Sequence, residues 1–118
     1  MEQRPVLGLI EHVLIIGNKG VQEKVLARID TGATSSSIDE RLAEKLDLGP
    51  MVRLKLVKSA SGSKRRPLIH VKIKINGKIM EEEFTVADRA HMTYPLLIGQ
   101  NILKKEKFLI DPLKKESK

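Results

Sequence analysis

The sequence lacks cysteine and tryptophan, and its aromatic residues are limited to Phe84, Tyr94 and Phe108. Without cysteine, disulfides and thiolate nucleophiles are excluded, and a zinc site would need histidines and carboxylates as ligands. Because aromatic side chains are scarce, a hydrophobic core has to consist mainly of leucine, isoleucine and valine. The β-branched members of that set favour strands, so the composition favours a β-rich fold.

Long hydrophobic runs are also missing. No apolar stretch approaches the roughly 20 residues that a membrane-spanning helix needs, and the chain does not open on a basic segment followed by an apolar one, as a signal peptide does. We therefore expect a cytoplasmic protein without a membrane partner.

Basic residues outnumber acidic ones, which gives a formal net charge of +7. This charge admits a basic nucleic-acid-binding barrel as one interpretation. The basic residues are spread along the chain, with the densest clusters at residues 64–66 and 104–118. Aromatic side chains that could stack on bases are nearly absent, so nucleic acid is the weaker alternative.

The pattern along the chain is one of short strands separated by turns. Glycine-containing turns at Gly17–Gly20 and Asn76–Gly77 are typical of hairpins, and Asp39 is placed to cap a short helix. Gly99 would open a second helix. Strands are expected at residues 6–16, 21–29, 51–57, 68–75, 79–86, 96–98 and 108–110. We predict an all-β fold, a small closed β-barrel with one or two short helices, formed by residues 5–112 and followed by a charged tail at 113–118.

One short motif carries the chemistry. Asp30-Thr31-Gly32-Ala33 directly follows the apolar run at residues 25–29 and occurs once. A carboxylate at the end of a buried strand, followed by a hydroxyl and a glycine, is what an aspartic peptidase requires. By itself the same triplet is also an ordinary turn. If Asp30 is catalytic, one chain holds half of an active site.

Further elements in the expected order strengthen this interpretation. A hairpin around residues 59–64 and the segment Leu97-Ile98-Gly99 follow the Asp30 motif. With these elements the chain resembles the retropepsin-type aspartic peptidases over roughly residues 5–110. The resemblance implies a symmetric homodimer that cleaves a peptide or protein substrate, with Asp30 as the catalytic residue of each chain. The residues implied to support the active site are Thr31, Gly32, Ala33, Leu97, Ile98 and Gly99.

Four motifs are similar to a more specific family, the one named ATP-dependent zinc proteases, which is retropepsin-like in fold despite its name. They are found at residues 29–33, 65–69, 88–99 and 108–112. One branch of that family is associated with enzymes that add or remove glutamate residues on a ribosomal protein. The basic residues beside the hairpin favour acidic, glutamate-rich peptide substrates. The residues expected to bind substrate are Thr34, Ser35, Ser59, Gly62, Arg65 and Arg66.

Three positions depart from the retropepsin pattern. Retropepsins carry acidic residues just after the catalytic motif and an arginine after the late glycine, and these form an ion pair. Here the corresponding positions hold Thr34, Ser35 and Gln100. All of them are neutral, so a hydrogen bond is expected to replace the ion pair.

Other chemistries have less support. The three histidines, His12, His70 and His91, do not form a His-Glu-x-x-His segment, and Asp88 with His91 lacks an evident third ligand. We expect no metal and no cofactor. The serines at 35–37 lie outside a nucleophile-elbow motif and are expected to be loop and strand-edge residues.

The sequence thus predicts a homodimeric, retropepsin-like aspartic endopeptidase. The alternative of the same fold is a catalytically inactive module that binds peptides, and the nucleic-acid-binding barrel is the third possibility.

Overall fold

The computed structural model describes residues 3–59 and 62–115, and within them the chain is mostly strand. The elements in chain order are β1 (Val6–Leu7), β2 (Ile10–Ile16), β3 (Gln22–Ile29), β4 (Ser37–Asp39), α1 (Glu40–Lys45), β5 (Arg53–Ser59), β6 (Gly62–Ile75), β7 (Lys78–Ala87), β8 (Leu96–Ile98), α2 (Gln100–Lys105) and β9 (Leu109–Ile110). Neither helix in these ranges has the length or apolar character to cross a membrane.

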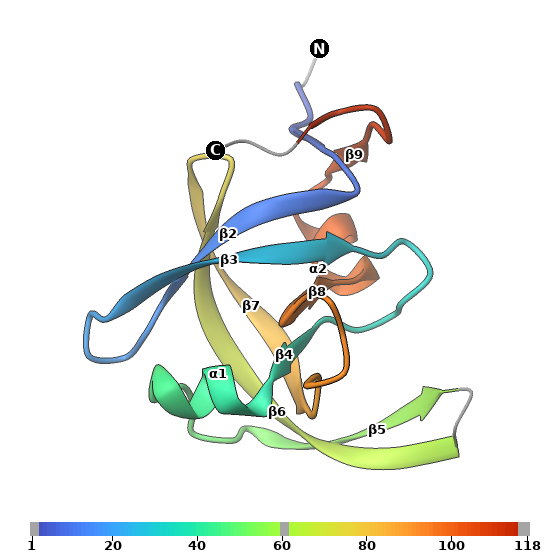
Figure 1. The fold of residues 1–118 in the computed structure, drawn as a ribbon. Helices are drawn as coiled ribbons and strands as arrows, with labels where there is room; N and C mark the ends of the chain where they lie inside the picture. Colours follow the sequence, from blue (N-terminus) through green and yellow to red (C-terminus); the bar gives the residue numbers. More distant parts are fainter. Residues whose placement is uncertain (1–2, 60–61, 116–118) are drawn as a thin grey trace.

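The main sheet closes into a barrel (Figure 1). Its strand order is β2-β3-β8-β4-β7-β6-β5, and an additional pairing of β2 with β6 joins the two sides. Six strands therefore form the closed ring, while β5 pairs with β6 alone and lies outside it. The predicted class, a small closed β-barrel with two short helices, is confirmed.

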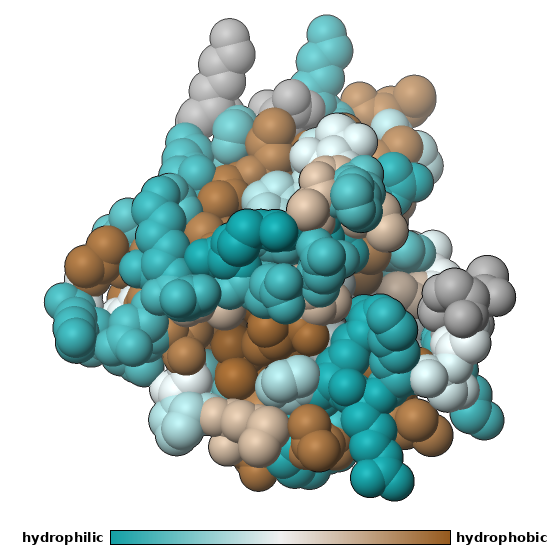
Figure 2. Space-filling model, turned by 60° about the horizontal axis from the view of Figure 1, so that its bottom comes forward, coloured by the Kyte–Doolittle hydropathy of each residue, from teal (hydrophilic) through white to brown (hydrophobic). Residues whose placement is uncertain are grey.

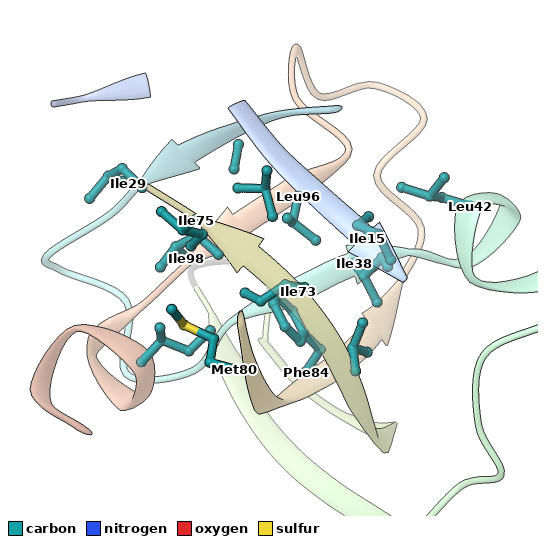
Figure 3. Close-up of a cluster of buried hydrophobic side chains, with 14 of the residues drawn as sticks. Ile15, Ile29, Ile38, Leu42, Ile73, Ile75, Met80, Phe84, Leu96 and Ile98 are labelled. Atoms are coloured by element: carbon teal, nitrogen blue, oxygen red, sulfur yellow. The ribbon is translucent and has the colours of Figure 1, made fainter. Parts of the chain in front are cut away.

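Aliphatic side chains fill the barrel, as the shortage of aromatics requires. Ile15, Ile73 and Ile98 are fully buried, and the aromatic residue Phe84 is buried to the same extent (Figure 3). Buried residues alternate with partly buried ones along β2 and with exposed ones in the second half of β6, because successive side chains of a strand point to opposite faces. The period-2 pattern of the sequence thus determines which side chains of these strands enter the core.

The first predicted strand is wrong in its extent. Residues 6–16 form two strands, because the chain bends at Gly8. A Cβ at Gly8 would lie 2.6 Å from the carbonyl oxygen of Lys114, and the Gly8 amide donates to the buried carboxylate of Glu11 over 2.7 Å. Lys114 Nζ contacts the same carboxylate oxygen at 2.6 Å. The packed part of the chain therefore extends two residues past the domain boundary predicted at 112.

The hairpin formed by β5 and β6 projects away from the barrel (Figure 1). Leu54 and Leu56 on its outer strand are 52% and 55% exposed. The face of the molecule that brings this hairpin forward mixes hydrophobic and hydrophilic surface (Figure 2). The hairpin is on the same side of the barrel as the loop that follows β3, so the two enclose a space between them (Figure 1).

Candidate active site

Asp30 is positioned by two neighbouring strands. It directly follows β3, which pairs in parallel with β8 so that Ile29 lies opposite Ile98. The Asp30 amide continues this ladder by donating a hydrogen bond of 2.9 Å to the carbonyl oxygen of Ile98. Because both strands belong to the closed barrel, the backbone at Asp30 is held by the core.

The turn after Asp30 orients its carboxylate. The Gly32 amide donates to Asp30 Oδ1 over 2.9 Å, and the Ala33 amide donates to the Asp30 carbonyl oxygen over 3.4 Å. This is an Asx-type turn, in which the carboxylate accepts from the backbone two residues on. Within the described ranges Oδ2 has no hydrogen-bond donor, Asp30 is half-buried and Thr31 is exposed. The turn therefore engages one carboxylate oxygen and leaves the other without a donor from the described residues.

The loop at the start of α2 supports this turn from the side. The Gln100 amide donates to the carbonyl oxygen of Ala33 over 2.7 Å, and its side-chain Nε2 donates to the carbonyl oxygen of Thr31 over 2.8 Å. The Gln100 side chain thus bonds to the backbone of the Asp30 motif, and not to Thr34 or Ser35, whose positions correspond to the other half of the ion pair. Of the two other neutral positions, Thr34 accepts from the Asn101 amide through its carbonyl oxygen, over 3.3 Å.

Ser36, which was expected to be a loop or strand-edge residue, connects the two loops. Its side chain is fully buried, its hydroxyl accepts from the Gly99 amide over 2.8 Å, and it donates to Asn101 Oδ1 over 2.7 Å. Asn101 Nδ2 in turn donates to the carbonyl oxygen of Glu83 over 3.0 Å. The only signal for Ser36 was its place in a polar run between a candidate catalytic turn and a buried strand.

Between the Asp30 loop and the β5–β6 hairpin lies a cleft of about 620 Å³. It is lined by Gly32, Ala33, Thr34, Ser35, Ser37, Lys55, Leu56, Val57, Lys58, Arg66, Thr85, Arg89 and Leu97. The lining includes four cationic side chains and no carboxylate among the described residues. A cleft of this charge favours an anionic ligand.

The cleft lining contains six of the thirteen residues expected at the site, Gly32, Ala33, Thr34, Ser35, Arg66 and Leu97, whereas Asp30 and Thr31 adjoin it at Gly32. Arg66 lines it, whereas Arg65 does not, because neighbouring residues of β6 point to opposite faces. Ser59 and Gly62 end β5 and begin β6 at the hairpin tip and are not in the lining. Ile98 and Gly99 are buried behind the Asp30 turn. Residues 60–61, which lie between Ser59 and Gly62 at the hairpin tip, are outside the described ranges.

Lys58 was expected among the basic residues beside the hairpin and lines the cleft, whereas the sequence did not single out Lys55 or Arg89 as cleft residues. For Lys55 the alternation of β5 was a usable signal, because Lys55 lies opposite Arg66 in the hairpin register. Arg89 follows β7 in a loop, where no periodicity indicates the direction of a side chain.

An ion-pair network forms the wall beside the cleft. Asp39 Oδ1 accepts from Arg41 Nη2 and from the Arg89 amide, both over 2.8 Å, and Arg41 Nη2 also contacts Asp88 Oδ1 at 2.9 Å. Burial raises the pKa of Asp39, but the hydrogen bonds from Arg41 and Arg89 outweigh it and hold that pKa below its ordinary value. Asp88 thus bonds to Arg41, and the described ranges contain no group of three histidines or carboxylates that could hold a metal ion.

The closed barrel, the aspartate turn and the projecting hairpin are together features of the retropepsin-like proteins. The family whose sequence model matches is the RimB-like family, described as "Retropepsin-like aspartic endopeptidase RimB", over residues 39–118, which is 80 of the 118 residues. The chain belongs to this family. The matched segment begins after the Asp30 motif, so the position of Asp30 is supported by the fold and not by this match.

Two solved structures share the fold. A protein of unknown function from Legionella pneumophila has a TM-score of 0.67 at 17% identity, with 98% of each chain covered. EIAV protease, in complex with the inhibitor HBY-793, also has a TM-score of 0.67, at 22% identity, with 94% of this chain and 95% of that chain covered. No curated protein matches the sequence.

Proposed function

We propose that this protein is an aspartic endopeptidase that acts as a homodimer, with one Asp30 from each chain, on acidic segments of peptides or proteins. The observation that supports this most directly is the Asp30 carboxylate, fixed by the Gly32 amide at the edge of a cationic cleft. Family membership supports the reaction class, and the exposure of Thr31 and Gly32 leaves the turn open to an equivalent turn from a second chain.

In the proposed dimer, Asp30 and the partner's Asp30 share one proton, because two carboxylates about 3 Å apart cannot both ionise. The ionised carboxylate takes a proton from a water molecule while the water oxygen attacks the peptide carbonyl carbon. The other carboxyl gives its proton to the carbonyl oxygen. The tetrahedral diol then breaks its C–N bond as the first carboxyl protonates the leaving nitrogen, and a hydroxyl proton returns to the second carboxylate.

The supporting residues keep the carboxylates in position. Gln100 and the carbonyl of Ile98 fix the backbone on either side of the Asp30 motif. Ser36, which directly precedes β4, accepts a hydrogen bond from the Gly99 amide and so connects Gly99 to that strand. A rigid, preorganised pair of carboxylates needs little rearrangement during the reaction. Four cations around the cleft, Lys55, Lys58, Arg66 and Arg89, would bind the carboxylates of an acidic substrate.

The test is cleavage of a peptide that contains a run of glutamates, with a glutamine peptide of the same length for comparison. We expect cleavage of the glutamate peptide by the native protein, insensitivity to a chelator, and loss of activity of at least 10³-fold, as an order of magnitude, in Asp30→Asn. Asp47→Asn is a matched control, because Asp47 is exposed and pairs with Lys19 outside the cleft. Mixing native chains with an excess of Asp30→Asn should also reduce activity, since a mixed dimer has one catalytic carboxylate.

Two outcomes would contradict this function. A chain that stays monomeric at assay concentration and binds the glutamate peptide without cutting it is the inactive peptide-binding module. A chain whose cleavage persists in Asp30→Asn, or disappears with the chelator, uses a different mechanism. Binding to nucleic acid with a steep dependence on salt would instead identify the basic barrel.

A further inference from the structure

Arg89 holds its guanidinium in a fixed place on the wall of the cleft. Its Nε donates to the carbonyl oxygen of Tyr94 over 3.1 Å, and its Nη1 donates to the hydroxyl of Ser37 over 3.0 Å. The backbone of the same residue is anchored separately, through the bond of its amide to Asp39. These contacts use two of the five N–H donors of the guanidinium, so three remain for a ligand.

Among the described residues, the charge of Arg89 has no acidic partner in an ion pair. In the described part of the chain no carboxylate oxygen lies within 4 Å of its guanidinium, and the nearby carboxylate of Asp39 is bonded to Arg41. The residue is nonetheless half-buried. Burial lowers the pKa of Arg89, whereas the charges of Asp39 and Asp30 raise it. A partly desolvated cation without a counter-ion is unfavourable unless something else binds to it.

A second cation faces the same space. Arg66 projects into the cleft from β6, which belongs to the hairpin, whereas Arg89 projects from the loop after β7. Both side chains line the same cleft, and the charge of Arg66 adds to the effect of burial in lowering the pKa of Arg89. One carboxylate between them would compensate both charges and accept hydrogen bonds from both.

We propose that Arg89 is the specificity-determining residue of this cleft, and that it binds the side-chain carboxylate of a glutamate or aspartate in the substrate, with Arg66 as the second cation. Ser37 is then a positioning residue, which aims the guanidinium without touching the substrate. This inference rests on the proposed function for its substrate, but the binding step does not require cleavage.

The competing explanation is structural. Arg89 would then only tie the loop containing Tyr94 to β4. Two arguments favour binding. A purely structural role uses only two of the N–H donors of the guanidinium, and it would not require a positively charged side chain beside Arg66. The two explanations differ in one measurable respect, which is whether removing Arg89 changes the preference for glutamate over glutamine.

The experiment measures binding in the Asp30→Asn background, where no peptide is consumed. A fluorescently labelled peptide with one glutamate in an otherwise neutral sequence is compared with the same peptide carrying glutamine, by anisotropy. We expect the glutamate peptide to bind roughly tenfold more tightly, as a charge-assisted hydrogen bond warrants. Adding Arg89→Gln should reduce this ratio to about 1 to 2, whereas Arg89→Lys, which keeps the charge, should retain part of it.

Matched variants separate local binding from general charge. Arg53→Gln removes the same charge from an exposed position that is not in the cleft lining, and it should leave the ratio unchanged. Ser37→Ala keeps Arg89 but removes one of its two anchors, and it should lower the ratio partially. If Arg89→Gln weakens binding of both peptides equally, with the glutamate preference intact, Arg89 is a loop tie and the proposal is wrong.

Failure of this inference can be told from failure of the proposed function. Selective binding that depends on Arg89, in a protein that cuts neither peptide, supports the inference and contradicts the peptidase. Cleavage by the native protein in which Arg89→Gln leaves the glutamate-to-glutamine ratio of kcat/KM unchanged supports the peptidase and overturns the inference.

Discussion

The hydroxyl of Ser36 accepts a hydrogen bond of 2.8 Å from the amide of Gly99, a residue 63 positions further along the chain. Because the same hydroxyl donates to Asn101, one buried side chain joins the segment after the Asp30 turn to the helix α2 that supports this turn. The geometry of the candidate active site therefore depends on a residue that has no contact with substrate in the proposed mechanism.

Ser36→Ala should destabilise the protein. The substitution leaves the buried Gly99 amide without its acceptor, which costs about 1–3 kcal/mol in the free energy of unfolding. Urea denaturation followed by circular dichroism measures the change. Ser63→Ala, at an exposed position of the hairpin, should change the same quantity by less than about 0.5 kcal/mol. Equal stability of the native protein and Ser36→Ala would show that water replaces the hydroxyl.

Alanine substitutions at two glycines should differ in their effect on stability. A Cβ at Gly99 would lie 2.3 Å from the carbonyl oxygen of Ser35, which is backbone and cannot move aside, so Gly99→Ala should cost at least about 3 kcal/mol. A Cβ at Gly32 would meet only Asp30 Oδ1, at 3.4 Å. Gly32→Ala should therefore fold normally, while activity falls because the added methyl group lies beside the proposed catalytic carboxylate. Thermal unfolding and peptide cleavage test the two halves separately.

Local signals predicted the antiparallel part of the fold. The Asn76–Gly77 turn has φ of +53° and +78°, as a type I′ hairpin requires, and it sets the register of β6 against β7. Asp39 caps α1 by accepting from the Arg41 amide over 3.3 Å. Signals of this kind are contained in a few adjacent residues, so the sequence displays them.

Long-range pairings were not visible in the same way. The parallel pairs β3–β8 and β4–β7 join segments far apart in the sequence, and no turn residue specifies them. The motif resemblance supplied that arrangement for Asp30 and Ile98. It gave no direction for Arg89, whose side chain is set by contacts with Ser37 and Tyr94.

Glu82 shows how a local pattern can be informative and still be overlooked. It stands between two other glutamates in β7, yet the alternation with Met80 and Phe84 places it inside, where it is 2% exposed. Lys105 Nζ lies 3.1 Å from its Oε1, although that oxygen has no well-directed hydrogen bond. Burial and a hydrogen bond with Glu106 raise the pKa of Glu82 to about 7, against the opposing effect of Lys105.

This pKa predicts a pH dependence of stability that Glu82→Gln should remove. Between pH 4.5 and about 7 the folded protein keeps the Glu82 proton that the unfolded chain has lost, so stability falls as the pH rises through this window. The contribution is on the order of 3 kcal/mol at most, and the opposing effect of Lys105 is already included in the pKa of about 7.

Urea denaturation at several pH values from 4 to 8 measures the effect, as the difference between Glu82→Gln and the native protein. The advantage of the variant should grow with pH up to about 7 and then stay constant. Glu44→Gln, at an exposed position of α1, should show no such trend. A difference that does not vary with pH would mean that Glu82 is ionised throughout, with Lys105 and the nearby Lys78–Glu106 pair fixing its charge.

The Asp39–Arg41 pair predicts the opposite dependence at acid pH. Although burial raises the pKa of Asp39, hydrogen bonds from Arg41 and Arg89 bring it below the ordinary 3.8, and hydrogen bonds from the Ala90 amide and Arg41 lower that of Asp88. A carboxylate with a depressed pKa stabilises the fold above 3.8, and this contribution is lost as the pH falls through the folded-state pKa.

Arg41→Gln should therefore lower the melting temperature at pH 7, and the difference from the native protein should shrink as the pH falls below 3.8. The exposure of Arg41 limits the size of the effect, since solvent screens the pair. Arg53→Gln controls for the loss of one positive charge. The Arg89 amide keeps its bond to Asp39 in Arg41→Gln, so the cleft wall should persist and the glutamate preference should survive. Loss of that preference would show that Arg41, by holding Asp39 and Asp88 together, also sets the position of the Arg89 guanidinium.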